Sequence, residues 1–131
     1  MVCLVTIRHP AAFNGQQAES SVAQRIGHHR LAAMRHVRGQ CEIICLTRGP
    51  KGSVILSGDE VHIIDPLPLD TVVDTTGAGD QFAAGFLFGY TQGMDLRKCG
   101  DIATLTATEV ISHVGARPEM SLKELLEREF G

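Results

Sequence analysis

The stretch Asp74-Thr75-Thr76-Gly77-Ala78-Gly79-Asp80 decides how this chain folds. A β-prone segment, residues 71–73, precedes it, and a run rich in Phe, Ala, Gly and Leu follows it as far as Tyr90. This order predicts a strand, a tight glycine turn and a buried helix. The glycines allow the backbone amides of residues 77–79 to converge at the start of the helix, where the helix dipole also favours negative charge. The sequence therefore predicts an anion-binding site at this turn.

Asp80 falls in the first turn of the predicted helix, beside the anion site. A carboxylate stabilised by a helix N-terminus stays ionised at neutral pH, and it can accept a hydroxyl proton during phosphoryl transfer. A dinucleotide-binding fingerprint fits less well, because it needs a third small residue at position 82, which is Phe. A purely structural turn, with Asp80 as a first-turn acid, fits the spacing as well as the anion site does.

The same residues carry a resemblance to a known family. Residues 74–87, Asp-Thr-Thr-Gly-Ala-Gly-Asp-Gln-Phe-Ala-Ala-Gly-Phe-Leu, are similar to the C-terminal signature of the PfkB (ribokinase-like) sugar and nucleoside kinases. The resemblance covers residues 41–129 and implies that Asp80 is the catalytic base. It also implies that three backbone amides form the anion hole over the transferred phosphate: those of Gly77, Ala78 and Gly79.

A second turn resembles the family's nucleotide-binding element. Residues 42–47 are apolar and β-branched and predict a strand. The turn that follows matches the pattern Thr-x-Gly-x-x-Gly at Thr47, Gly49 and Gly52. The resemblance implies that this turn lies along the phosphates and ribose of a nucleotide, with Thr47 as a hydroxyl donor. Without the resemblance, the same residues indicate a plain hairpin turn.

The resemblance further implies a monovalent cation, K⁺, beside the anion hole. Its ligands would be the Asp74 carboxylate and the backbone carbonyls of Thr76, Val110, His113 and Gly115. The loop around His113 and Gly115 would also line an adenine pocket. The structural alternatives are that Asp74 is a capping acid and that His113 is an ordinary loop residue.

The remaining pattern alternates strands and helices, which indicates an α/β fold. The apolar character of residues 80–90 on almost every side predicts a helix buried on several sides. By resemblance, the chain is the C-terminal part of a three-layer α/β/α sandwich. The other expected elements are strands at 2–7, 52–57 and 60–65, and helices at 16–37, at 96–113 after the Asp95 cap, and after the capping box 121–124.

Residues 1–40 match the family poorly, whereas residues 41–131 form its nucleotide-binding portion. Residues 1–38 carry five arginines and one acid, a charge of +4 in a chain whose net charge is −3. A solvated basic face accounts for this, and a role with nucleic acid is not expected. The family's Asn-x-x-Glu element has its candidate at residues 14–17, where Gln17 replaces the acid and weakens a role with Mg²⁺. Alternatively, this segment does not align with the family.

Composition is that of an ordinary globular protein, with 44% hydrophobic and 21% charged residues. The four cysteines form no Cys-x-x-Cys pair and are expected to be reduced core thiols of a cytoplasmic protein. No segment predicts a signal peptide or a membrane span.

The function that the resemblance implies is transfer of the γ-phosphate of ATP, with Mg²⁺, to an alcohol of a sugar or nucleoside. The run from Glu109 to Pro118 is similar to bacterial adenosine-kinase-type sugar kinases. The acceptor-binding half of the family has no counterpart in this chain. The alternative is therefore a non-catalytic, nucleotide-binding or partner-dependent truncated paralogue, and both a homo-oligomer and a missing N-terminal half are open.

Overall fold

A four-stranded antiparallel sheet lies at the centre of the computed structural model, which describes residues 4–7, 27, 34, 41–58 and 60–131. Its strands neighbour one another in sequence order, and each pairs in antiparallel fashion with the next. They are β1 (Leu4–Ile7), β2 (Ile43–Thr47), β3 (Ser53–Ser57) and β4 (Glu60–Ile64). All four were predicted, and the structure confirms them with slightly shorter ends.

The described sheet is buried on both faces, because successive side chains of a strand point to opposite sides. The face toward the C-terminal helices contributes Ile43, Cys45, Ile55 and Ile64. The opposite face contributes Ile44, Leu46, Val54 and Leu56, and these pack with Met34, which is helical and 2% exposed. Such two-sided burial belongs to a sheet between two layers, as in an α/β/α sandwich.

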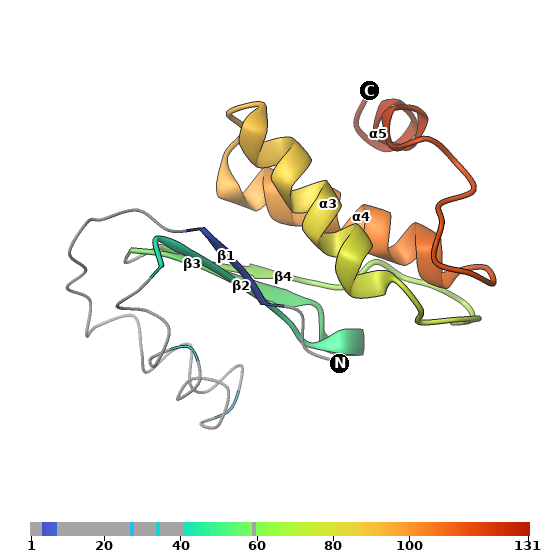
Figure 1. Cartoon of the computed structure of the whole chain (residues 1–131), viewed down its shortest axis with the longest axis horizontal. Helices are drawn as coiled ribbons and strands as arrows, with labels where there is room; N and C mark the ends of the chain where they lie inside the picture. Colours follow the sequence, from blue (N-terminus) through green and yellow to red (C-terminus); the bar gives the residue numbers. More distant parts are fainter. Residues whose placement is uncertain (1–3, 8–26, 28–33, 35–40, 59) are drawn as a thin grey trace.

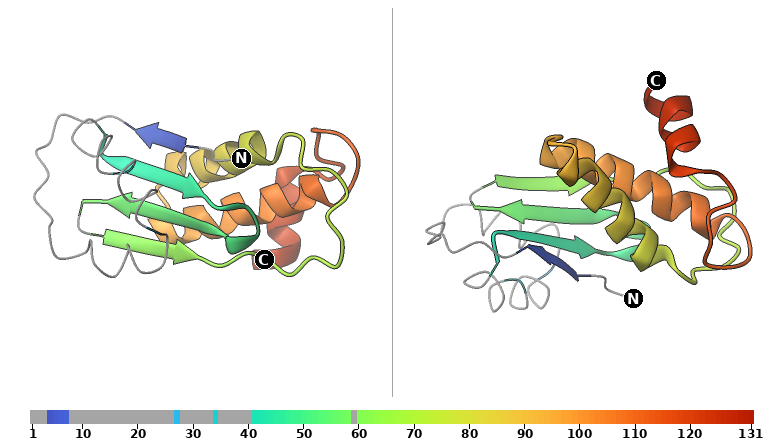
Figure 2. Two further views of the ribbon diagram at one scale, coloured as in Figure 1. Left: turned by 90° about the horizontal axis from the view of Figure 1, so that it is seen from below. Right: turned by 45° about the horizontal axis from the view of Figure 1, so that its top comes forward.

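Three helices follow the sheet: α3 (Ala78–Thr91), α4 (Leu96–Ile111) and α5 (Leu122–Phe130). α3 and α4 lie together over one face of the sheet, and α5 lies beyond α4 (Figure 1; Figure 2). Local signals set their starts. The Asp95 side chain accepts from the Lys98 amide at 2.9 Å, and Ser121 and Glu124 form the predicted capping box.

α3 and α4 approach closely because glycines of α3 face α4. At Gly85, an added Cβ would lie 2.9 Å from the Ala103 Cα, and at Gly89 it would lie 3.1 Å from the Cys99 Sγ. The Thr106 hydroxyl of α4 donates to the Gln81 carbonyl of α3 at 2.7 Å. The first turn of α3 is therefore held directly by α4.

β4 is the edge strand of the described sheet on the side away from β1. Arg97 of α4 reaches over it, and its Nη1 donates to the Ile63 carbonyl at 3.2 Å. Cys45 and Cys99 are buried, as expected for core cysteines, whereas Cys41 is half-buried.

Three expectations were wrong in detail. Residues 71–73 form no strand: Val72 and Val73 are more than half exposed, and the Val73 amide donates to the Ile111 carbonyl at the end of α4. Among the described residues, no neighbouring strand pairs with this segment. Helix α4 ends at Ile111, two residues before the expected end at His113. Ser112 is its C-cap, and the Ser112 hydroxyl donates to the Glu109 carbonyl at 2.6 Å.

The third expectation that was wrong is that α3 would be buried on several sides. Its buried residues lie on one face, and the other side exposes large apolar residues: Leu87, Phe88 and Tyr90, at 42%, 37% and 36%. The sequence of α3 is apolar on almost every side, but only one face of this helix is buried in the described structure.

Several predictions lie outside the described residues. These are Cys3, the Asn14–Gln17 element and all of the 16–37 helix except Gly27 and Met34. The proposed boundary at residue 40 also stays a prediction. Among the described residues, no helix is long and apolar enough to cross a membrane.

We predict that Gly85→Ala destabilises the protein by about 1–3 kcal/mol, because the new methyl group would overlap the α4 backbone. An alanine in an unobstructed helix would instead stabilise it by about 1 kcal/mol. Urea unfolding followed by circular dichroism measures the change. Ala84→Leu, on the exposed side of α3, is the matched control and should change stability by about 0.5 kcal/mol or less. A Gly85→Ala variant as stable as the wild type would contradict the close helix contact.

Candidate functional site

The glycine turn begins α3 as predicted. Gly77 is the N-cap and adopts φ of 80°, a left-handed conformation that favours glycine. An added Cβ at Gly77 would also lie 2.7 Å from the Ala116 Cβ, so this position requires glycine for two reasons. Asp80 follows in the first helical turn and is exposed. The structure thus places the candidate base at the surface, next to the turn.

The Ala78 amide, which was predicted for the anion hole, is already engaged in a turn. The Ala78 amide donates to the Thr75 carbonyl at 3.2 Å, a long hydrogen bond. The first amides of a helix have no partner within the helix, so a bound anion at this place would exchange a weak bond for a charge-assisted one.

Asp74 connects the turn to the loop that follows α4. Its Oδ1 accepts from the Thr76 amide at 2.9 Å, and its Oδ2 accepts from the Gly115 amide at 3.1 Å. Hydrogen bonds from Thr76 and then from Gly115 lower the pKa of Asp74, because they stabilise its charged form. The resemblance implied that Asp74, Thr76 and Gly115 belong to one cation site. In the structure the three lie together, with the amides of Thr76 and Gly115 donating to the Asp74 carboxylate.

His113 is oriented by two carboxylates. Its Nε2 lies 3.2 Å from Oε1 of Glu109, one turn back on α4, and its Nδ1 lies 4.0 Å from Oε1 of Glu119. Burial disfavours the charged form of this histidine. The hydrogen bonds to Val114 and Glu109, with the charges of Glu109 and Glu119, outweigh that effect and raise the pKa of His113.

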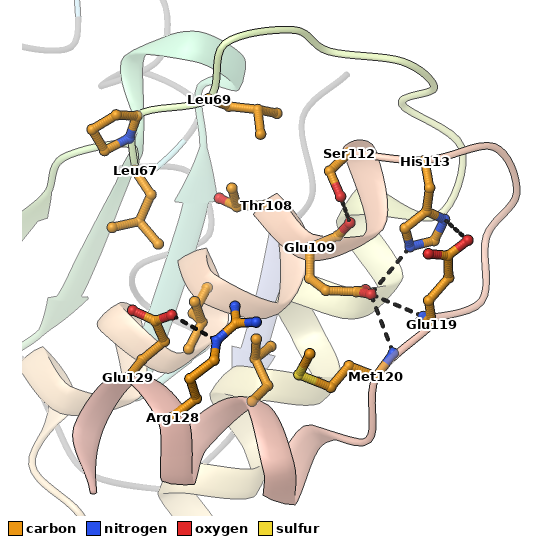
Figure 3. Close-up of a pocket in the computed structure, with 13 residues that line it drawn as sticks. Leu67, Leu69, Thr108, Glu109, Ser112, His113, Glu119, Met120, Arg128 and Glu129 are labelled. Atoms are coloured by element: carbon orange, nitrogen blue, oxygen red, sulfur yellow. Dashed lines mark hydrogen bonds and ion pairs between the residues drawn. The ribbon is translucent and has the colours of Figure 1, made fainter.

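A pocket of about 750 Å³ lies between α4, α5 and the segment that precedes the glycine turn (Figure 3). Its walls are both apolar and polar, and His113 is part of them. The lining residues are Leu67, Pro68, Leu69, Leu105, Thr108, Glu109, Ser112, His113, Glu119, Met120, Leu125, Arg128 and Glu129.

Most of these lining residues were missed from the sequence. Residues 65–68 indicated only a break in regular structure, and the terminal helix was interpreted as purely structural. The long helical spacing of α4 included Leu105 and Glu109 but did not show which side would face a cavity. The signal that was available is the loop around His113, which does line the pocket.

The turn at residues 47–52 is a hairpin between β2 and β3, containing the short 3₁₀ helix η1 (Gly49–Lys51). Gly49 and Gly52 have φ of 58° and 80°, and the Ile64 carbonyl leaves no room for a side chain at Gly52. This turn does not line the pocket. It lies at the same end of the sheet as the start of α3 and the loop after α4, in both views of Figure 2.

A family model described as "pfkB family carbohydrate kinase" matches residues 16–123. The chain belongs to this family. The matched range begins inside residues 1–40, the segment that we expected to match poorly. As a pfkB-family protein, the chain also resembles kinases of known sequence and structure over 60–88% of its length.

Among curated sequences, an uncharacterized sugar kinase of Archaeoglobus fulgidus is 42% identical over 89 residues, which are 68% of this chain and 35% of that protein. A nucleoside kinase of Methanocaldococcus jannaschii is 40% identical over 60% of this chain and 26% of its own length. The chain therefore spans about a third or less of these pfkB-family relatives.

Solved structures of kinases are also similar to this chain. A probable sugar kinase from Rhizobium etli matches with a TM-score of 0.71 and 40% identity, over 88% of this chain and 34% of that one. The adenosine kinase from Sinorhizobium meliloti matches with a TM-score of 0.71 and 36% identity, over 88% and 35%. The predicted family and its ribokinase-like α/β fold are confirmed.

We predict that Asp74→Asn lowers the melting temperature at pH 7, because one of the two amides would face an NH₂ group instead of an acceptor. The folded-state pKa of Asp74 is lower than its reference of 3.8, so its charge stabilises the fold above that pH. The difference between variant and wild type should shrink as the pH falls below 3.8 through the folded-state pKa. Calorimetry over pH 2.5–7 measures it, with Asp70→Asn, at an exposed loop carboxylate, as the control. A constant difference at every pH would contradict this role.

Proposed function

We propose that this chain carries the nucleotide-binding and base-bearing portion of a kinase that transfers the γ-phosphate of ATP to an alcohol of a sugar or nucleoside. The observation that supports this most strongly is the exposed Asp80 carboxylate in the first turn of α3, directly after the left-handed glycine turn. A base and an anion site at one helix start are what phosphoryl transfer to a hydroxyl requires.

In this proposal, Asp80 accepts the proton of the attacking hydroxyl. The amides of Gly77, Ala78 and Gly79 stabilise the charge that develops on the transferred phosphoryl group, aided by the dipole of α3. α4 holds this constellation through the Thr106–Gln81 hydrogen bond of 2.7 Å. Such rigid support matters because catalysis of phosphoryl transfer depends mainly on positioning.

The pocket is proposed to bind the base and ribose of the nucleotide. Its volume of about 750 Å³ is in the range of small-molecule sites, and apolar walls with a few polar groups suit a planar base. The turn at Thr47, Gly49 and Gly52 would lie along the phosphates at the same end of the sheet.

The described residues suit a metal ion that is bound mainly by the substrate. No group of three or more His, Cys, Asp or Glu side chains in the described ranges could hold a metal. Mg²⁺ typically keeps several waters and binds phosphate oxygens with few protein ligands, so this arrangement fits it. When bound, Mg²⁺ would neutralise phosphate charge.

A K⁺ site beside the anion hole also remains part of the proposal. Asp74, the one carboxylate in it, already lies against Gly115 at 3.1 Å. The remaining ligands would be the carbonyls of Thr76, Val110, His113 and Gly115.

A partner-dependent, truncated paralogue is the second candidate. Leu87, Phe88 and Tyr90 expose an apolar side of α3, and the chain spans about a third of its relatives' length. Both features would fit a chain that works only against further protein, from another subunit or from a missing N-terminal half.

We predict that the chain binds ATP with Mg²⁺ and that Gly77→Ala weakens binding at least about tenfold. The substitution would strain the left-handed turn and collide with Ala116, which displaces the amides. Isothermal titration calorimetry measures the affinity. Gly93→Ala is the matched control, because Gly93 has φ of 73° but open space around it. No heat with wild-type protein would favour the partner-dependent, truncated paralogue.

We further predict that the isolated chain turns over ribose, fructose or adenosine only weakly, and that Asp80→Asn reduces this residual transfer by about 10²–10⁴-fold. ATP affinity should stay within about twofold, because Asp80 acts on the acceptor. A coupled assay for ADP measures transfer, and Asp101→Asn, at an exposed ion pair of 3.9 Å with Arg97, is the control. Robust turnover by the wild-type chain would refute the incomplete-kinase interpretation, and full activity of Asp80→Asn would refute the assigned base.

A further inference from the structure

The loop of residues 112–120 connects the glycine turn to the pocket. Near its middle, the Gly115 amide donates to Asp74 at 3.1 Å, and Ala116 packs directly on Gly77. At its two ends, Ser112, His113, Glu119 and Met120 line the pocket. The position of this one loop therefore determines both the pocket wall and the contact over the turn.

One carboxylate oxygen on α4 holds both ends of this loop. Oε1 of Glu109 lies 2.9 Å from the Glu119 amide, 3.4 Å from the Met120 amide and 3.2 Å from Nε2 of His113. Figure 3 shows these three contacts meeting at one oxygen of Glu109, from the His113 end of the loop and from its Glu119–Met120 end. The side chains of Glu109 and His113 are each 12% exposed.

The other oxygen of Glu109 makes no such contact in the described residues. Oε2 is buried, and it has no hydrogen-bond partner in the part of the chain that the structure describes. A buried carboxylate oxygen without a partner is energetically unfavourable, but an apolar residue in place of Glu109 would leave the amides of Glu119 and Met120 without this acceptor. Glu109 therefore combines an unfavourably buried Oε2 with three contacts to the loop at Oε1.

His113 provides the charge that balances Glu109. Its Nε2 faces Glu109, and its Nδ1 faces the Val114 carbonyl at 3.4 Å and Glu119 at 4.0 Å. Because both ring nitrogens face acceptors, only the doubly protonated imidazolium satisfies them both. Asp74 also acts on His113 through its charge, whereas Arg128 and Glu129, which line the pocket from α5, pair with each other at 3.0 Å.

We propose that Glu109 is a positioning residue, and that its carboxylate, balanced by protonated His113, fixes the 112–120 loop where it forms the pocket wall and rests on the glycine turn. This inference rests on the proposed nucleotide site and assigns it an internal support. Neither residue needs to contact the nucleotide in this role.

Hydrogen–deuterium exchange tests the support without any ligand. In Glu109→Gln, the amides of Glu119 and Met120 lose their charged acceptor, and their exchange should accelerate by roughly tenfold. Glu127→Gln, on the exposed face of α5, is the matched control and should leave this loop unchanged. Circular dichroism verifies folding, and His113→Gln provides a second variant in which exchange should also accelerate. Unchanged exchange in both variants would overturn the proposal.

The pH dependence of ATP affinity tests the balancing charge. The pKa of His113 is raised above 6.5, so the support is complete below that pH and is lost as the pH rises through the folded-state pKa. Wild-type affinity measured over pH 6–9 should therefore fall with rising pH by roughly three- to tenfold. In His113→Gln this step should be absent, and affinity should be low throughout. A step of the same size in His113→Gln would overturn the role of this charge.

The two proposals fail in different ways. If the wild-type chain binds no ATP, the proposed function fails, and with it the positioning of a nucleotide wall, even where the exchange data reveal the Glu109 contacts. If ATP binds equally well to the wild type and to Glu109→Gln at every pH, the nucleotide site stands and the positioning role is overturned. Weaker binding to Glu109→Gln with faster exchange at Glu119 and Met120 supports both.

Discussion

The close packing of α3 on α4 is the constraint on which the rest of the structure depends. Glycines at positions 85 and 89 remove the side chains that would keep the helices apart, and the Thr106 hydroxyl then reaches the Gln81 carbonyl at 2.7 Å. This bond joins α4 to the first turn of α3, the turn that carries Asp80. The helix that presents the candidate base is thus fixed along its buried side, although its other side is exposed.

Two carboxylates organise the loop after α4 in the same way. Asp74 accepts the Gly115 amide, and Glu109 accepts the amides of Glu119 and Met120. Backbone amides in an irregular loop have no regular partners, and carboxylates are strong acceptors for them. The loop therefore has a defined path between the glycine turn and the pocket without belonging to a helix or a strand.

Elements with strong local signals could be predicted from the sequence. Apolar, β-branched runs located β2 and β3, the glycine turn located the start of α3, and Asp95 and Ser121 capped the next two helices as expected. The strand predicted at residues 71–73 is not formed. A strand depends on a neighbouring strand to pair with, and local propensity does not show whether one is present. The buried side of α3 could not be predicted for a related reason. The whole surface of this helix is apolar, and only packing decides which side is covered.

The same distinction applies to the candidate site, where residues in motifs could be predicted and contacts between distant residues could not. Asp74, His113 and Gly115 were recognised from motif positions, and the structure places them in one loop system. Glu109 was missed because two of its three partners are backbone amides ten and eleven positions away, which have no residue-type signature. The roles of Asp80 and of the amides at 77–79 remain proposals, because they depend on how a substrate would lie.

The guanidinium of Arg97 has a consequence for how the sheet ends. An edge strand offers unpaired carbonyls and amides to any other extended chain, and natural proteins often protect such edges with charged side chains. Here the Ile63 carbonyl of β4 is already occupied by Arg97, and a guanidinium is held against the backbone at that position. An incoming strand would have to displace this cation before it could pair with β4 at Ile63.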